Sequence, residues 1–171
     1  MRSRALIVDD DQSMCEMLYE SLERRGFATT WRTSGTEAFH LLETEDFDVV
    51  VTDLNMSGMN GLDLCSRIVA NRPDIPVVVL TAFGSLDSAV AAMRAGAHDF
   101  ITKPVDVDAL ALVLGRAAQH RELREEVKRL REVVDASRHF GELLGASPPM
   151  KRLYDLIERV AGTLWQWPKC A

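Results

Sequence analysis

The 171-residue sequence lacks several features that define particular classes of protein. It has no hydrophobic run near the roughly 20 residues that a transmembrane helix needs, and no secretory leader with an apolar segment and a cleavage site. The cysteines Cys15, Cys65 and Cys170 show no paired spacing, so neither a disulfide scaffold nor a CxxC zinc or redox site is indicated. We therefore expect a cytoplasmic protein, without membrane contact, whose thiols stay reduced.

A basic surface is also missing from most of the chain. The net charge is −6, and acidic residues outnumber basic ones over 1–119, whereas 120–171 is slightly basic. Nucleic-acid binding needs a concentrated positive face, so this chain is not expected to bind DNA or RNA directly. The hydrophobic fraction of 47% and the charged fraction of 27% are typical of a folded globular protein rather than of a disordered chain.

Short apolar runs alternate with helical patterns over 3–119. The expected strands are 5–8, 27–31, 47–53, 77–81 and 99–102, and each is followed by apolar residues at helical spacing. Apolar strands that alternate with helices indicate a parallel sheet covered on both faces. Five such units predict an α/β, flavodoxin-like, doubly wound (βα)5 fold with strand order 2-1-3-4-5. In that fold, ligands bind beyond the carboxyl ends of the strands.

Four of the expected strand ends carry polar side chains that suit phosphoryl chemistry: Asp9 and Asp10, Asp53, Thr81, and Lys103. The predicted strand order brings these ends to one edge, where three carboxylates repel one another unless a cation lies among them. Oxygen ligands favour Mg²⁺ over zinc. Asp53 is then the best candidate for a nucleophile that forms an aspartyl phosphate, with Asp9 and Asp10 as metal ligands. Lys103 and Thr81 can bind the phosphoryl group.

These residues resemble the motif set of bacterial response-regulator receiver domains over residues 3–119. The pieces that carry the resemblance are Asp9-Asp10, Asp53 with Met56 and Gly61, Thr81-Ala82, and Lys103-Pro104. The resemblance implies that Asp53 accepts phosphate from a sensor histidine kinase. It also implies that Asp10 binds Mg²⁺ directly and Asp9 through water, together with Asp53 and the backbone carbonyl of Asn55.

The resemblance assigns the remaining pocket residues as well. Thr81 and Lys103 would bind the phosphoryl group, and Phe100 matches an aromatic switch position that turns inward when Thr81 moves toward the phosphate. The sequence departs from the pattern at Ser57, where proline is more usual, and we expect this difference to loosen the loop after Asp53.

A long helix is predicted from Asp106 to about Arg138, a stretch with no proline and one glycine. Steps of three and four residues, typical of a heptad repeat, connect His120, Leu123, Val127, Leu130 and Val134. Glu126 and Arg131 fall at g and e positions, where charges on two parallel helices can pair. We expect a homodimer through the receiver and a coiled-coil linker at 120–139. A solvated single helix is the alternative.

The next segment, residues 140–163, resembles the beginning of the AAA+ ATPase domain of sigma-54 activators of the NtrC type. Phe140–Ser147, followed by Met150-Lys151, carries that resemblance. No GxxxxGK[ST] phosphate loop occurs in the chain, so we expect a fragment without ATPase activity. Residues 164–171 depart from the family pattern and are interpreted as a non-native tail. Sigma-54 RNA polymerase and DNA would be reached only through domains missing from this chain.

Two other functions compete with this interpretation. A pseudo-receiver would serve only as an interaction module, but Asp53, Thr81 and Lys103 are all present. A small-molecule phosphatase of related topology usually has a second acid in a DxD motif, whereas Asp53 is followed by Leu54-Asn55. We therefore expect a phosphorylation-controlled regulator of transcription rather than a turnover enzyme, with self-phosphorylation and autodephosphorylation as its only chemistry.

Overall fold

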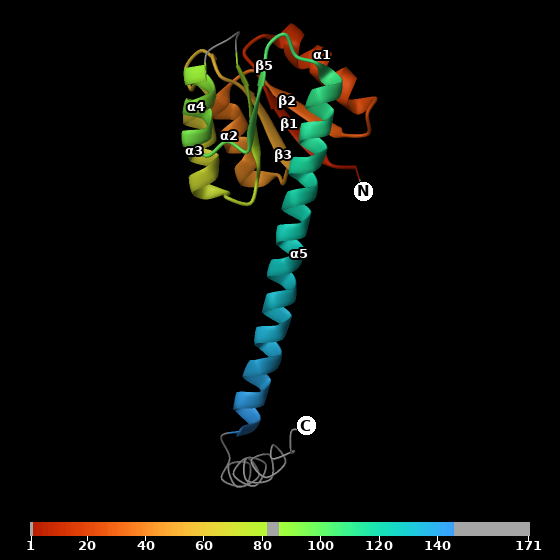
Figure 1. The fold of residues 1–171 in the computed structure, drawn as a ribbon, viewed down its shortest axis with the longest axis vertical. Helices are drawn as coiled ribbons and strands as arrows, with labels where there is room; N and C mark the ends of the chain where they lie inside the picture. Colours follow the sequence, from red (N-terminus) through yellow and green to blue (C-terminus); the bar gives the residue numbers. More distant parts are fainter. Residues whose placement is uncertain (1, 82–85, 146–171) are drawn as a thin grey trace, which may run out of the picture. The chain divides into compact units, whose positions relative to one another are not determined.

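The computed structural model describes residues 2–81 and 86–145, and it describes side chains as far as residue 133 apart from Leu86 (Figure 1). The chain divides into two compact units, residues 1–125 and residues 126–171. The helix predicted to end near Arg138 continues to Gly145, so the described part of the predicted ATPase segment (140–163) is helical. The rest of that segment and the predicted non-native tail at 164–171 lie outside the described residues.

A five-stranded parallel sheet forms the centre of the first unit. Its strands are β1 (Arg4–Val8), β2 (Ala28–Arg32), β3 (Val49–Asp53), β4 (Val77–Thr81) and β5 (Asp99–Thr102). They pair in the order β2-β1-β3-β4-β5, and every pair is parallel, so the predicted doubly wound order is confirmed. All residues of β3 and β4 are buried, as expected for strands that are covered on both faces.

Helices cover both faces of the sheet (Figure 1). One face packs against α1 (Gln12–Glu23) and the N-terminal part of α5 (Val107–Gly145), and the other against α2 (Gly35–Thr44), α3 (Gly61–Asn71) and α4 (Leu86–Arg94). Successive strand side chains point to opposite faces, so Leu6 and Val79 join the second layer while Ile7 and Leu80 join the first. Burial on both faces fixes the register, and with it the positions of the strand ends.

A buried arginine holds the N-terminal part of α5 on the first unit. Arg121 is 8% exposed, and its guanidinium donates to the Phe47 carbonyl at 2.7 Å and to the carboxylates of Asp48 and Asp74 at 3.0 and 3.1 Å. Glu125 adds a fourth contact at 2.9 Å. Phe47 and Asp48 precede β3 and Asp74 precedes β4, so a single side chain ties α5 to the loops that enter two central strands.

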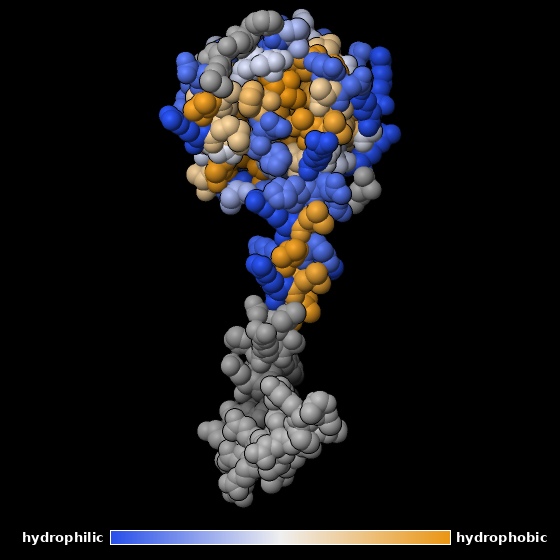
Figure 2. Space-filling view, viewed as in Figure 1, coloured by the Kyte–Doolittle hydropathy of each residue, from blue (hydrophilic) through white to orange (hydrophobic). Residues whose placement is uncertain are grey.

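Farther along, α5 carries apolar side chains that are exposed. Leu123 in the first unit is exposed, as are Val127, Leu130 and Val133 in the second. Figure 2 shows hydrophobic side chains along one side of this part of α5. The backbone of α5 includes Val134, whose side chain lies outside the description. None of the helices in the described part of the chain combines the length and hydrophobicity that a membrane span requires.

Candidate functional site

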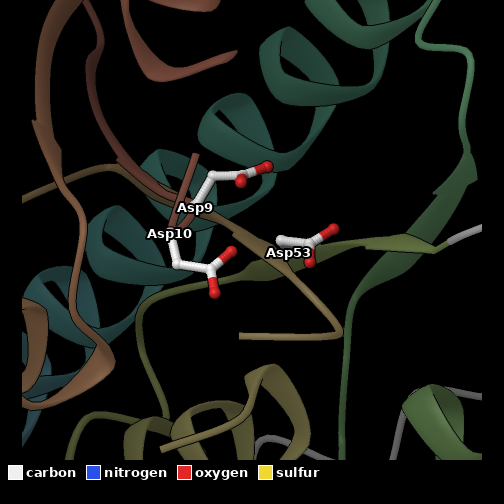
Figure 3. A group of neighbouring side chains, drawn as sticks. All are labelled: Asp9, Asp10 and Asp53. Atoms are coloured by element: carbon white, nitrogen blue, oxygen red, sulfur yellow. The ribbon is translucent and has the colours of Figure 1, made fainter. Parts of the chain in front are cut away.

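Three carboxylates meet at the carboxyl edge of the sheet (Figure 3). Asp9 and Asp10 follow β1, Asp53 ends β3, and the strand order places these two strands side by side. Asp9, Asp10 and Asp53 each offer one oxygen, and these oxygens lie within 4.8 Å of one another. Asp9 and Asp53 are buried, whereas Asp10 is exposed. The structure thus brings together the acidic residues that the sequence singled out.

Lys103 balances part of this negative charge. Its ammonium lies 2.7 Å from Asp53 Oδ1 and 2.9 Å from Asp9 Oδ2. Burial by itself would lower the pKa of Lys103, but its hydrogen bonds with Asp53 and Asp9 outweigh burial and raise the pKa above the ordinary value. The Lys103 backbone N–H also donates to the Thr81 carbonyl at 2.7 Å, and Thr81 is buried at the end of β4. Both predicted phosphoryl-binding residues therefore lie at this edge.

The loop between β3 and α3 is built around the Asp53 backbone and carboxylate. The Asn55 N–H donates to Asp53 Oδ2 at 2.9 Å, and the Gly61 N–H donates to the Leu54 carbonyl at 3.0 Å. A Cβ at Gly61 would lie 2.0 Å from the Asp53 carbonyl oxygen, so only glycine allows this close approach. This tight return brings the start of α3 back against the end of β3.

Ser57 links the same loop to a second carboxylate. Its backbone N–H donates to Asp10 Oδ2 at 2.9 Å. We expected serine to loosen this loop relative to the more usual proline, but the backbone N–H that proline lacks here makes a tie. Sequence reasoning missed this contact because a backbone donor leaves no mark on residue type.

The beginning of α1 fixes the position of Asp9. Asp11 caps the helix by accepting the Ser13 N–H at 2.9 Å, and the Asp11 N–H donates to Asp9 Oδ1 at 3.0 Å. The Cys15 thiol lies 3.3 Å from the Asp9 carbonyl oxygen. Burial, together with the nearby Asp9 charge, raises the pKa of Cys15 to about 11. The thiol is therefore neutral and acts as a small packing group below the acidic site.

The comparison with protein families decides the identity of the first unit. The family described as "Response regulator receiver domain" matches residues 5–114. The chain belongs to the response regulator receiver family. The matched range includes Asp9, Asp10, Asp53, Thr81 and Lys103, which carry the sequence resemblance.

Regulatory proteins of other bacteria are similar to this chain. The C4-dicarboxylate transport transcriptional regulatory protein DctD of Rhizobium meliloti is 35% identical over 157 residues, which cover 92% of this chain and 34% of the relative. Response regulator protein PilR of Pseudomonas aeruginosa is 39% identical over 160 residues, with 94% and 34% covered. The chain thus spans about one third of the length of the curated relatives that it matches.

Solved structures show the same likeness. The structure of NtrX from Brucella abortus in complex with ADP superposes with a TM-score of 0.71 at 32% identity, covering 94% of this chain and 34% of that one. A response regulator receiver domain protein from Clostridium thermocellum gives a TM-score of 0.67 at 30% identity, covering 71% and 98%.

The predicted switch residue Phe100 and the predicted dimer residues lie outside the acidic cluster. Phe100 pairs with Val79 in the β4–β5 register and is exposed. His120 is exposed on α5, with its ring centroid 5.7 Å from that of His98. His120 and Leu123 belong to the first unit, whereas Val127 and the other predicted dimer positions belong to the second.

Proposed function

We propose that this chain is the phosphoacceptor of a two-component system and that Asp53 receives a phosphoryl group from a sensor histidine kinase. The observation that carries the proposal is the state of the Asp53 carboxylate. It is buried, one oxygen is held by Lys103, and the other accepts the Asn55 N–H. In the transfer, an Asp53 oxygen bonds to phosphorus while the phosphorus–nitrogen bond to the kinase histidine breaks.

The residues present fit a magnesium ion. All three side chains offer oxygen, and the single Lys103 cation contacts two of the three carboxylates, which leaves negative charge at the site. We propose that Asp9, Asp10 and Asp53 hold Mg²⁺ together with the Asn55 backbone carbonyl. Asp10 is exposed, so a hydrated ion can reach it. When bound, Mg²⁺ neutralises charge on the transferring phosphoryl group.

The proposed response to phosphorylation involves Thr81 and Phe100. The phosphoryl group brings new acceptor oxygens to the pocket, which the Lys103 ammonium and the Thr81 hydroxyl can engage. Movement of Thr81 leaves space into which the Phe100 ring, exposed in this structure, can turn. The surface around α4, β5 and α5 then changes shape. This makes the chain a regulatory acceptor rather than an enzyme that turns over an external substrate.

The proposed output passes through a parallel homodimer. Val127 and Val134 occupy a positions, and Leu123 and Leu130 occupy d positions, a choice that favours two-stranded parallel coiled coils. The described members of this set are exposed, so they are available to a second copy. The likeness to DctD and PilR extends beyond the receiver match at 5–114, which supports control of sigma-54-dependent transcription; such control would act through domains other than the receiver.

Intact-mass measurement with acetyl phosphate and Mg²⁺ tests the phosphoacceptor. One phosphoryl adduct that hydroxylamine removes is expected in the wild-type chain and in Asp87→Asn, a matched change at an exposed aspartate on α4. Asp53→Asn should give none. The absence of an adduct in the wild-type chain would leave only a pseudo-receiver. Steady release of phosphate from an added ester, by contrast, would indicate the phosphatase.

Two valines of α5 provide a matched test of the dimer. Val127 lies at an a position and Val133 at a g position, and both side chains are exposed. Light scattering should report a dimer for the wild-type chain and for Val133→Glu, and a monomer for Val127→Glu. A wild-type chain that is monomeric, with or without beryllofluoride and Mg²⁺, contradicts the coiled coil.

A further inference from the structure

One backbone donor connects two parts of the acidic site that come from distant segments. The Ser57 N–H, in the loop after Asp53, donates to Asp10 Oδ2 at 2.9 Å. Asp10 follows β1 and Ser57 lies between β3 and α3, so this bond closes a long-range contact between the two loops. Both residues are exposed. The contact is therefore held by hydrogen bonding rather than by burial.

Asp10 differs from the other two carboxylates in its hydrogen-bond and ion-pair partners. Lys103 contacts Asp9 and Asp53 but does not pair with Asp10. Across residues 2–81 and 86–133, the Ser57 N–H is the one donor that reaches the Asp10 carboxylate. The orientation of this exposed carboxylate therefore depends on a single charge-assisted hydrogen bond, the stronger class of hydrogen bond in proteins.

The same loop is anchored to Asp53 through the Asn55 N–H at 2.9 Å. Two backbone donors that lie two residues apart, the N–H groups of Asn55 and Ser57, thus connect one short segment to two carboxylates of the cluster. A carboxylate that is already oriented loses less conformational freedom when it binds a cation, so preorganisation increases affinity. An ionised carboxylate has about four acceptor sites on two oxygens, so Asp10 can accept the N–H and still bind a metal.

We propose that the Ser57 backbone N–H is a positioning group for the cation: it holds Asp10 in its binding orientation and keeps the Asn55–Ser57 segment beside it. The inference rests on the proposed function, since it assumes that Mg²⁺ binds at Asp9, Asp10 and Asp53. The group that matters is the main-chain donor and not the hydroxyl. Alanine at this position keeps the donor, whereas proline removes it.

The test compares Ser57→Pro with the conservative Ser57→Ala. Each variant is titrated with Mg²⁺ alone, and binding is monitored by the NMR chemical shifts of backbone amides. We expect Ser57→Pro to weaken the affinity for Mg²⁺ by about tenfold, which is the scale for losing one charge-assisted hydrogen bond. The affinity of Ser57→Ala should stay within about twofold of wild type. Equal affinities for Ser57→Pro and wild type, or equal losses in both variants, would overturn the proposal.

A second measurement does not depend on Ser57→Pro being folded. In the metal-free wild-type chain, hydrogen exchange of the Ser57 amide should be slowed, and Asp10→Ala should release it. An unprotected Ser57 amide in wild type overturns the inference. Failure of the proposed function has a different signature: a wild-type chain that binds no Mg²⁺ and forms no phosphoryl adduct removes both ideas. Normal binding that is insensitive to proline removes only this one.

Discussion

Replacing Arg121 with methionine should destabilise the first unit by an amount that the contacts of Arg121 define. The Arg121 side chain is 8% exposed, while the side chains of its partners Asp48, Asp74 and Glu125 are 39%, 37% and 54% exposed. Breaking a fully buried ion pair costs about 3–5 kcal/mol, but water can rehydrate these partly exposed carboxylates, so we expect about 2–3 kcal/mol. Methionine keeps much of the side-chain volume, so the loss reflects the charged contacts rather than a cavity.

One feature of Arg121 in the wild-type chain reduces the expected loss of stability. Within the described residues, Arg121 Nε is buried without a hydrogen-bond partner, and methionine removes that unpaired donor. The substitution also removes the charged donor that lies 2.7 Å from the Phe47 carbonyl, which increases the loss of stability. These two contributions are each about 1 kcal/mol and opposite in sign, so the expected loss remains about 2–3 kcal/mol.

Urea unfolding measures the change directly. Arg124→Met on the same helix is the matched control, because Arg124 is exposed and forms no ion pair among the described residues. Its free energy of unfolding should stay within about 0.5 kcal/mol of wild type. For Arg121→Met, the melting temperature should fall by about 10 °C. A loss below about 1 kcal/mol, or equal losses in the two variants, would refute the anchoring role of Arg121.

Three further predictions concern the site and the core. Gly61→Ala places a Cβ 2.0 Å from the Asp53 carbonyl oxygen, so it should lower both the urea midpoint and phosphoryl-adduct formation, and normal values for both would contradict the loop geometry. Burial raises the pKa of Cys15 and Cys65 to about 11 from 9.0 and also shields both thiols from reagent, so their alkylation at pH 8, followed by peptide mass mapping, should be at least about 100-fold slower in the folded chain than in urea. The raised pKa of Lys103 means that its stabilising charge is fully present below the ordinary value of 10.5 and is lost as pH rises through the folded value. Metal-free stability should therefore fall at alkaline pH in wild type, and less so in Lys103→Met.

Much of the site could be predicted because it depends on the ends of strands. Apolar runs with a polar residue at the end, such as Val49–Asp53, mark both the strand and the side chain that it presents. Parallel order then places Asp9, Asp53 and Thr81 at one edge without knowledge of any contact. Local pattern and global topology agree at these positions, which is why sequence reasoning succeeds there.

The contacts that sequence reasoning missed have a different physical origin. Arg121 lies in a helix among other charged residues, so its pattern is that of a solvated face, and only tertiary structure shows that it is buried beside Asp48 and Asp74. The Ser57 contact uses a main-chain donor, which nearly every residue type possesses. Neither the burial of one charged side chain nor the aim of one N–H follows from periodicity or composition.

The two sides of the acidic edge differ in how firmly the sheet holds them. Strands β1 and β3, which lead to the three carboxylates, each have a neighbour on both sides, whereas β5 lies at the edge and, among the described strands, pairs with β4 alone. The Lys103 N–H bond to the Thr81 carbonyl and the Val79–Phe100 register couple the end of β4 to β5 along its length. Through these contacts, a displacement at Thr81 would reach Lys103 and Phe100 directly. Under the proposed function, the phosphoryl group would thus be attached on a strand that is paired on both sides, whereas the exposed Phe100 lies on a strand paired on one side, next to the surface.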